Sequence, residues 1–186
     1  MEFRWALIAM VGVMLLGTLK GILVAVIVSL VGLILHASLR PVHVLGRKPG
    51  TTSFFRPRSA EHPEDETFPG LLLLKVEGSV HFANASRLGD LIMPLVQEHR
   101  PRVLALDCSA MPDLEYTALK MLTEAEARLR ESGVVLWLAA LNPEPLRLVL
   151  KTPLGETLGR ERMIYSLKNV VEEYQRRYVG KTERKE

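Results

Sequence analysis

Apolar residues dominate the first 35 positions of the chain, and a mixed pattern follows after residue 41. Between residues 5 and 35 the only charged side chain is that of Lys20. One straight helix over this run would be about 46 Å long, whereas the hydrocarbon core of a bilayer is about 30 Å thick. Small and polar residues at 17–20 offer a break. The pattern therefore predicts transmembrane helices over 1–37, with a short or re-entrant helix at 4–16 and a spanning helix at 21–37.

A secretory signal peptide is the alternative interpretation of the apolar run. Such peptides have a shorter apolar region and end at a small-residue cleavage site. The run here is too long, and no such site leads into a soluble start. The sequence therefore favours membrane insertion.

Small residues recur at every fourth position of the run, at Gly17, Gly21, Ala25 and Ser29. This spacing places them on one helical face, where small side chains let membrane helices approach closely. We expect this stripe to pack against another membrane helix. Placing the charged side chain of Lys20 in lipid is energetically unfavourable. It lies either near a transport path or, as the sequence favours, at the membrane surface as a snorkelling lysine.

The segment after the apolar run is basic. Residues 36–58 contain no acidic residue and five basic ones, namely Arg40, Arg47, Lys48, Arg56 and Arg58. An excess of basic residues beside a membrane helix marks its cytoplasmic end. We therefore expect the chain to lie in the inner (plasma) membrane, with everything after this helix in the cytoplasm.

Proline, glycine and acidic residues are frequent over 38–69, which predicts a juxtamembrane linker with one short strand near 51–55. From residue 71 onward, short apolar runs bounded by turns predict buried strands. These runs cover residues 71–76, with a short extension at 80–82, and then 103–106, 134–139 and 163–165.

Amphipathic segments between these runs predict helices. The first begins at Asn84, and the second is capped by Asp113 and ends at Gly133. A third covers about 143–151, and a fourth begins at Ser166 and runs to about Tyr178.

This alternation predicts an α/β fold, with a mostly parallel sheet flanked by helices over residues 70–180. One or two transmembrane helices precede this domain. The highly charged residues 181–186 predict a disordered tail.

Composition excludes several classes of function. The net charge of the 186 residues is +3, and no Lys/Arg stripe is interleaved with aromatic residues, so we expect no nucleic-acid partner. The single cysteine, Cys108, excludes an internal disulfide and a cysteine-rich metal cluster. Walker, nucleophile-elbow and His-Glu-x-x-His sequences are missing. We expect no enzymatic activity, metal or cofactor, and interpret Cys108 as a small buried residue.

Several stretches carry, in order, a resemblance to a known family. Residues 17–30 look like a final membrane helix, and Arg40-Pro41 with residues 44–46 and 49–51 looks like the exit from the membrane. Residues 82–85 (Phe-Ala-Asn-Ala) and 106–118 look like two strand-to-helix elements of a STAS domain. In this order they resemble the C-terminal end of SulP (sulfate permease) anion transporters.

The resemblance implies a function for the chain. SulP proteins are secondary transporters of sulfate or similar anions, with roughly a dozen or more membrane helices and a cytoplasmic STAS domain that tunes transport, folding or oligomerisation. This chain lacks the inverted repeat that builds an anion site. We therefore expect that it cannot transport alone, and that it is either part of a longer protein or docks on a separate transport core. Expected partners are that transmembrane core, the lipid bilayer, and a cytosolic regulatory protein or nucleotide.

The loop before the second helix of the predicted domain is the candidate regulatory or interaction site, formed by Asp113, Glu115, Tyr116 and Thr117. The STAS domains of anti-sigma factor antagonists are switched by phosphorylation of a serine at the start of this helix. Tyr116 stands at that position, which argues against such a switch. We expect Thr117 to lie on the buried face of the helix. An independent membrane-tethered STAS module that binds a protein or nucleotide remains the second hypothesis.

The start of this helix offers backbone N–H groups that can bind a phosphate. However, the negative charges of Asp107, Asp113 and Glu115 surround it. We favour a simpler interpretation, in which Asp113 caps the helix and Glu115 stabilises its first turn through its charge.

Overall fold

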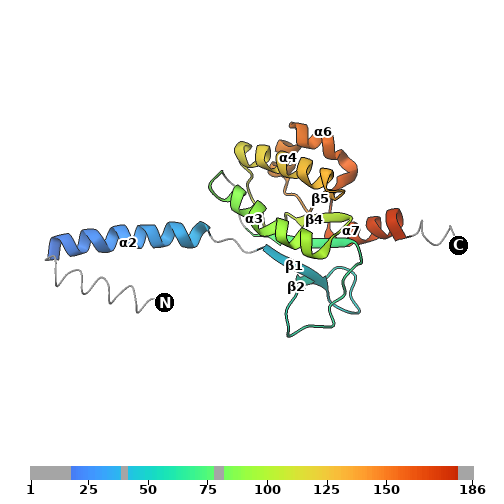
Figure 1. The fold of residues 1–186 in the computed structure, drawn as a ribbon, viewed down its shortest axis with the longest axis horizontal. Helices are drawn as coiled ribbons and strands as arrows, with labels where there is room; N and C mark the ends of the chain where they lie inside the picture. The colour runs from blue at the N-terminus through green and yellow to red at the C-terminus, as the bar shows by residue number, and fades with distance from the viewer. Residues whose placement is uncertain (1–17, 39–41, 78–81, 180–186) are drawn as a thin grey trace. The chain divides into compact units, whose positions relative to one another are not determined.

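The computed structural model describes residues 18–38, 42–77 and 82–179 (Figure 1). The chain divides into two compact units, Met1–Leu39 and Arg40–Glu186. The expected helix over 4–16, the first stripe residue Gly17 and the tail over 181–186 lie outside the described residues.

The first unit contains one described helix, α2 (Thr18–Ser38). Its residues 18–20 are helical, although the sequence predicts a break there. Eight large apolar side chains between Leu19 and Val31 are exposed. Gly21 is buried and Ser29 is exposed, with Ala25 between these extremes. Within the described ranges, no helix combines the length and the apolarity that crossing a membrane requires.

The second unit is built on a six-stranded sheet with the order β2-β1-β3-β4-β5-β6. Its strands are β1 (Val42–Arg47), β2 (Phe55–Pro57), β3 (Leu71–Val76), β4 (Val103–Asp107), β5 (Val135–Ala139) and β6 (Met163–Ile164). The strands β3 to β6 are parallel to one another, whereas β1 is antiparallel to both β2 and β3. The predicted mostly parallel sheet is therefore confirmed.

Part of the expected linker is folded into this sheet. Residues 42–47 form β1. The strand predicted near 51–55 is displaced, since β2 covers Phe55–Pro57 and shares only residue 55 with the prediction. A local pattern could not reveal β1, because a His, a Gly and an Arg interrupt its apolar residues. The strand is stabilised by pairing with β3, which lies some 30 residues further along the chain.

The helices of this unit are α3 (Phe82–His99), α4 (Tyr116–Glu131), α5 (Pro143–Leu150), α6 (Pro153–Leu158) and α7 (Leu167–Tyr174). A short 3₁₀ helix, η1 (Arg160–Arg162), precedes β6, and a π-helical turn, η2 (Gln175–Val179), follows α7. Phe82 begins α3, two residues before Asn84, where the sequence predicts the start of this helix. The short helix α6 has no counterpart among the predicted elements.

Two apolar layers cover the two faces of the sheet. Successive residues of β3 alternate between these layers, as the period of a strand requires. One layer packs α3, α4, α5 and α6 against the sheet. The other packs α7 against Trp137 and its neighbours. Because both faces are covered, the central strands β3 and β4 are apolar except for Lys75 and Asp107 near their carboxyl ends.

Candidate functional site

Parallel strands that end at the same edge of a sheet bring their following loops together. Here β3, β4 and β5 end at Val76, Asp107 and Ala139, which lie in register across the sheet apart from a shift of one residue at β3. We call this side of the sheet the carboxyl edge. In open α/β sheets, such edges are the usual place for a binding site. The loop 108–115, which leads from β4 to α4, carries two of the four candidate residues, and the other two begin α4 directly after it.

The β4–α4 loop is held in one conformation by its own polar groups. The backbone N–H of Ser109 donates to Oδ1 of Asp107 at 3.0 Å, and that of Met111 donates to the Cys108 carbonyl at 3.0 Å. The side chains of Met111 and Leu114 are buried and anchor the loop in the core. These contacts give the exposed residues of the loop fixed positions.

The neighbouring β5–α5 loop supports this loop from the side. Nδ2 of Asn142 donates to the carbonyl of Met111 at 2.8 Å and to that of Ser109 at 3.4 Å. Ala140 in the same loop adopts a left-handed conformation with φ of 53°, which is uncommon for a residue with a Cβ. The two loops at the carboxyl edge are therefore joined by a side chain that sequence reasoning assigned only to the start of α5.

Tyr116 and Thr117 both lie at the surface. Tyr116 is the first residue of α4, and 78% of its surface is exposed. The prediction that Thr117 belongs to the core is wrong, since this residue is exposed. Leu119 and Glu126 are buried instead, so the buried face of α4 is rotated away from Thr117.

The predicted capping role of Asp113 is also wrong. The residue at the N-cap position of α4 is Glu115, and no side chain forms a capping hydrogen bond there. Oδ1 of Asp113 instead accepts a hydrogen bond from the backbone N–H of Leu114 at 2.7 Å. Because α4 begins at Tyr116, Asp113 lies two residues too early to serve its first turn.

Cys108 is buried, as the sequence predicts, with 2% of its surface exposed. Burial, together with the charge of Asp107, raises the pKa of the thiol to about 12. Only the thiolate is a strong nucleophile, so Cys108 is inert at neutral pH.

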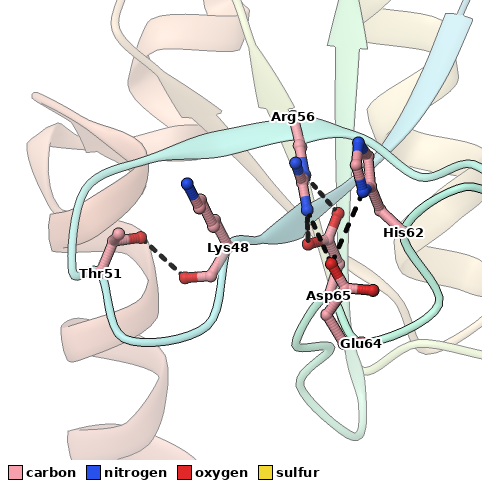
Figure 2. A network of polar contacts seen from close by, with 6 residues as sticks. All are labelled: Lys48, Thr51, Arg56, His62, Glu64 and Asp65. Carbon is pink, nitrogen blue, oxygen red and sulfur yellow. Dashed lines mark hydrogen bonds and ion pairs between the residues drawn. The ribbon is translucent and has the colours of Figure 1, made fainter.

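A second polar cluster lies near the β1–β2 hairpin (Figure 2). Sequence reasoning used Arg56 only as one of the basic residues that indicate membrane topology. The guanidinium of Arg56 donates from Nε to Oδ2 and from Nη2 to Oδ1 of Asp65, both at 2.8 Å. This side chain of Asp65 is inaccessible to solvent. The hydrogen bonds from Arg56 lower the pKa of Asp65, and those to Asp65 raise the pKa of Arg56.

More exposed groups extend this cluster. Arg56 also contacts Oε1 of Glu64 at 3.1 Å, and His62 lies 3.6 Å from the same carboxylate. In the loop 58–66, a buried carboxylate is thus fixed to β2 by a bidentate pair. The arrangement fastens a loop to the sheet. No group of three potential metal ligands occurs among the residues whose placement is described.

A groove of about 220 Å³ lies between α3 and α4. Apolar side chains form most of its walls, including those of Met93, Met121 and Leu122. Its polar residues are Asp90, Glu124 and Arg128.

Comparison with known proteins identifies similar sequences over most of the chain. The family described as STAS domain matches residues 62–173. "Sulfate transporter 3.1" of Arabidopsis thaliana is 27% identical over 182 residues, which cover 92% of this chain and 27% of that protein. "High affinity sulfate transporter 2" of Stylosanthes hamata is 25% identical over 164 residues, which cover 83% of this chain and 24% of that protein. The chain thus spans about a quarter of the length of these relatives.

Solved structures share the fold. The murine Slc26a9 anion transporter in its inward-facing state matches with a TM-score of 0.73 and 15% identity, over 91% of this chain and 28% of that one. The STAS domain of a SulP transporter from Vibrio cholerae matches with a TM-score of 0.50 and 20% identity, over 60% of this chain and 86% of that one.

Proposed function

Because the chain belongs to the STAS-domain family, we propose that it is the membrane-anchored regulatory and interaction segment of a SulP-type transporter of sulfate or a similar anion. Its relatives are sulfate transporters of the SulP/SLC26 family. In this proposal the STAS domain lies in the cytoplasm and tunes a transport core through protein contacts. In this proposal the chain has no catalytic role, and the anion binds to the transport core.

One observation carries the proposal. The similarity to the Arabidopsis sulfate transporter covers 92% of the chain, whereas the STAS domain itself accounts for residues 62–173. The shared sequence therefore extends well beyond the domain. A free-standing cytoplasmic STAS domain would have no reason to share that extension with a membrane transporter.

The membrane part of the proposal rests on the apolar run. A water-soluble protein rarely exposes a contiguous apolar surface, yet eight large apolar side chains of α2 are exposed. Contact with lipid would remove these side chains from water. The five basic residues of 36–58 assign the following domain to the cytoplasmic side. The stripe of Gly21, Ala25 and Ser29 then offers a close-packing face to a helix of the transport core.

The interaction part of the proposal rests on the carboxyl edge. Tyr116 takes the place at which a phosphorylated serine would act, so regulation here depends on contact. The β4–α4 loop is suited to contact, because Asn142 and Asp107 fix its backbone while Tyr116 remains exposed. A surface that is ordered before binding loses little conformational entropy when it docks.

Membrane fractionation tests the anchor. We expect the chain, expressed in a bacterial host, to remain with the membrane after extraction at alkaline pH. An impermeant maleimide should react with a Ser109→Cys variant only after the cells are opened. Extraction into the aqueous phase, or labelling in intact cells, would contradict the proposal.

Uptake measurements test whether the chain supports transport by a membrane core without transporting sulfate itself. In cells that lack sulfate uptake, the chain alone should give no radiolabelled sulfate uptake above an empty vector. A chimera in which this chain replaces the matched segment of the Arabidopsis transporter should transport more sulfate than that transporter with the segment deleted. Transport by the chain alone, or a chimera no better than the deletion, would overturn the proposal.

A further inference from the structure

The groove between α3 and α4 reaches down to the sheet. It encloses about 220 Å³, and its lining includes Leu104 and Leu106 of β4 and Leu136 of β5. These three residues belong to the buried core, with at most 4% of their surface exposed. A ligand that enters the groove therefore meets apolar side chains of α3, of α4 and of the sheet.

The two helices leave this space unfilled. Gly89 of α3 lines the groove, and a Cβ placed on it would meet no atom within 4 Å. On α4, the small side chains of Ala118 and Ala125 form part of the opposite wall. An apolar cavity of about 150 Å³ is large enough to bind benzene. The groove here is larger, so it can hold a phenyl ring together with the carbon atoms attached to it.

Three ionisable side chains accompany this apolar lining. They are those of Asp90 on α3 and of Glu124 and Arg128 on α4. All three residues are exposed, and none of them forms an ion pair with another residue in the described part of the chain. Glu124 and Arg128 lie one helical turn apart, which makes them neighbours on the surface of α4. The groove thus offers an unpaired cation beside unpaired anions.

This set of charges selects among small apolar ligands. A ligand that carries only a carboxylate can pair with Arg128, but the two acidic residues repel it. A ligand that carries only an ammonium group leaves Arg128 without a partner. A free α-amino acid bears both charges on one carbon atom, so its carboxylate can pair with Arg128 and its ammonium group with Glu124 or Asp90. An apolar body oriented by a few polar groups is the usual design of a small-molecule site.

We propose that the groove between α3 and α4 binds a free α-amino acid with a large apolar side chain, of the size of leucine or phenylalanine. The side chain of the ligand occupies the apolar interior, and its charged head lies among Asp90, Glu124 and Arg128. This inference goes beyond the proposed function and depends on neither the membrane anchor nor the transport core, because every residue of the site belongs to the unit Arg40–Glu186.

Nuclear magnetic resonance of isotope-labelled methionine methyl groups tests the site in the full chain in detergent. Met93 and Met121 line the groove, whereas Met163 is absent from its lining and serves as the internal control. L-phenylalanine should shift the signals of Met93 and Met121 saturably, with a Kd of about 1 mM for a ligand of this size. The absence of a saturable shift, or an equal shift at Met163, would refute the proposal.

Related ligands test the choice of an amino acid. Phenethylamine and 3-phenylpropionate present the same ring with only the ammonium group or only the carboxylate. Each should bind about threefold to fivefold more weakly than L-phenylalanine, since an exposed charge pair contributes little free energy. Glycine carries both charges without the apolar body and should shift neither signal measurably. Binding of either single-charge ligand as tightly as L-phenylalanine would rule out the amino-acid assignment.

Two variants separate the apolar contact from the charge. Gly89→Leu fills the free space and should abolish the shifts, while an unchanged Met163 signal shows that the domain is folded. Arg128→Gln should weaken L-phenylalanine about threefold to fivefold without weakening phenethylamine, which has no carboxylate. Arg130→Gln is the matched control, because Arg130 is exposed on the same helix outside the lining. It should leave both ligands unaffected.

Normal binding in a folded Gly89→Leu variant would contradict the proposal, as would equal effects of Arg128→Gln and Arg130→Gln. If Gly89→Leu does not fold, the comparison of the two arginine variants decides by itself, because both positions lie at the surface.

Discussion

Asn142 donates a hydrogen bond from Nδ2 to the carbonyl of Met111 at 2.8 Å, across 31 positions of sequence. The two residues belong to neighbouring loops at the carboxyl edge. This bond satisfies a partly buried carbonyl and joins the β5–α5 loop to the loop that presents Tyr116.

Replacing Asn142 should loosen this junction. We expect Asn142→Ala to lower the free energy of unfolding by about 1 kcal/mol, because a carbonyl loses its donor. Asn142→Asp should cost more, since it directs a carboxylate at two carbonyl oxygens. Urea unfolding of the chain in detergent measures the loss. Hydrogen exchange of the backbone amides of residues 109–113 should also accelerate, and unchanged exchange in both variants would contradict the assigned role.

The pair of Arg56 and Asp65 should respond to substitution as one unit. Arg56→Met leaves the buried carboxylate of Asp65 without its partner, which is strongly unfavourable. Adding Asp65→Asn removes that charge, so we expect the double variant to be more stable than Arg56→Met alone. Thermal unfolding of the two single variants and the double variant gives the coupling. Additive losses would show that the two side chains act independently.

The same pair should make stability depend on pH in the acid range. Hydrogen bonds from Arg56 hold the pKa of Asp65 below its ordinary value of 3.8. A carboxyl group whose pKa is depressed by folding stabilises the protein fully above its unfolded pKa, and this contribution is lost as pH falls through the folded value. The melting temperature should therefore decrease as the pH is lowered below about 4. The Asp65→Asn substitution should reduce this dependence on pH. An identical pH profile in the variant would contradict the assignment.

Cys108 should resist alkylation while the chain is folded. The rise of its pKa from 9.0 to about 12 lowers the thiolate fraction at pH 8 by about a thousandfold, and burial slows the reaction further. Iodoacetamide should modify the thiol only after unfolding, as mass spectrometry can follow. A Ser109→Cys variant, at the exposed neighbouring position, provides the control and should react in the folded chain. Rapid loss of the Cys108 thiol under native conditions would refute its burial.

Two helical glycines should respond in opposite ways to substitution by alanine. A Cβ on Gly155 in α6 would lie 2.8 Å from Cα of Leu150 and still closer to the Val149 carbonyl, both backbone atoms that cannot easily move. Gly155→Ala should therefore lower stability by about 1–3 kcal/mol.

Gly89 in α3 is the matched control, because nothing lies within 4 Å of the added Cβ. Gly89→Ala should raise stability by about 0.5–1 kcal/mol through helix propensity. Urea unfolding compares the two variants, and a neutral Gly155→Ala would show that α6 is less closely packed.

Local patterns predicted the buried strands and several helix ends correctly. The runs beginning at Leu71, Val103 and Val134 became the central strands within one residue. Ser166 caps α7 by accepting a hydrogen bond from the Asn169 backbone N–H, and Gly133 ends α4 with a φ of 77°. These features depend on residues close together in the chain, so a short segment of sequence is enough to predict them.

The wrong predictions concern features that depend on contacts between residues far apart in the sequence. Thr117 fits the apolar stripe of α4, but the helix buries a different face. This face includes Glu126, whose carboxylate lies 3.7 Å from the partly exposed guanidinium of Arg162. The strand β1 is stabilised by its pairing with β3, and no local pattern in either strand predicts this pairing.

The sequence alone determined the apolar run, the alternating strands and helices, the burial of Cys108 and the family resemblance, because periodicity and residue type express them directly. Only the tertiary structure decided that β1 begins at the carboxyl edge beside the end of β3, that Asn142 supports the β4–α4 loop, and that Arg56 holds Asp65. Each of these is a contact between segments 9 or more residues apart. Contacts of this kind form only when the whole sheet is assembled, since its hydrogen bonds and buried surfaces fix which segments meet.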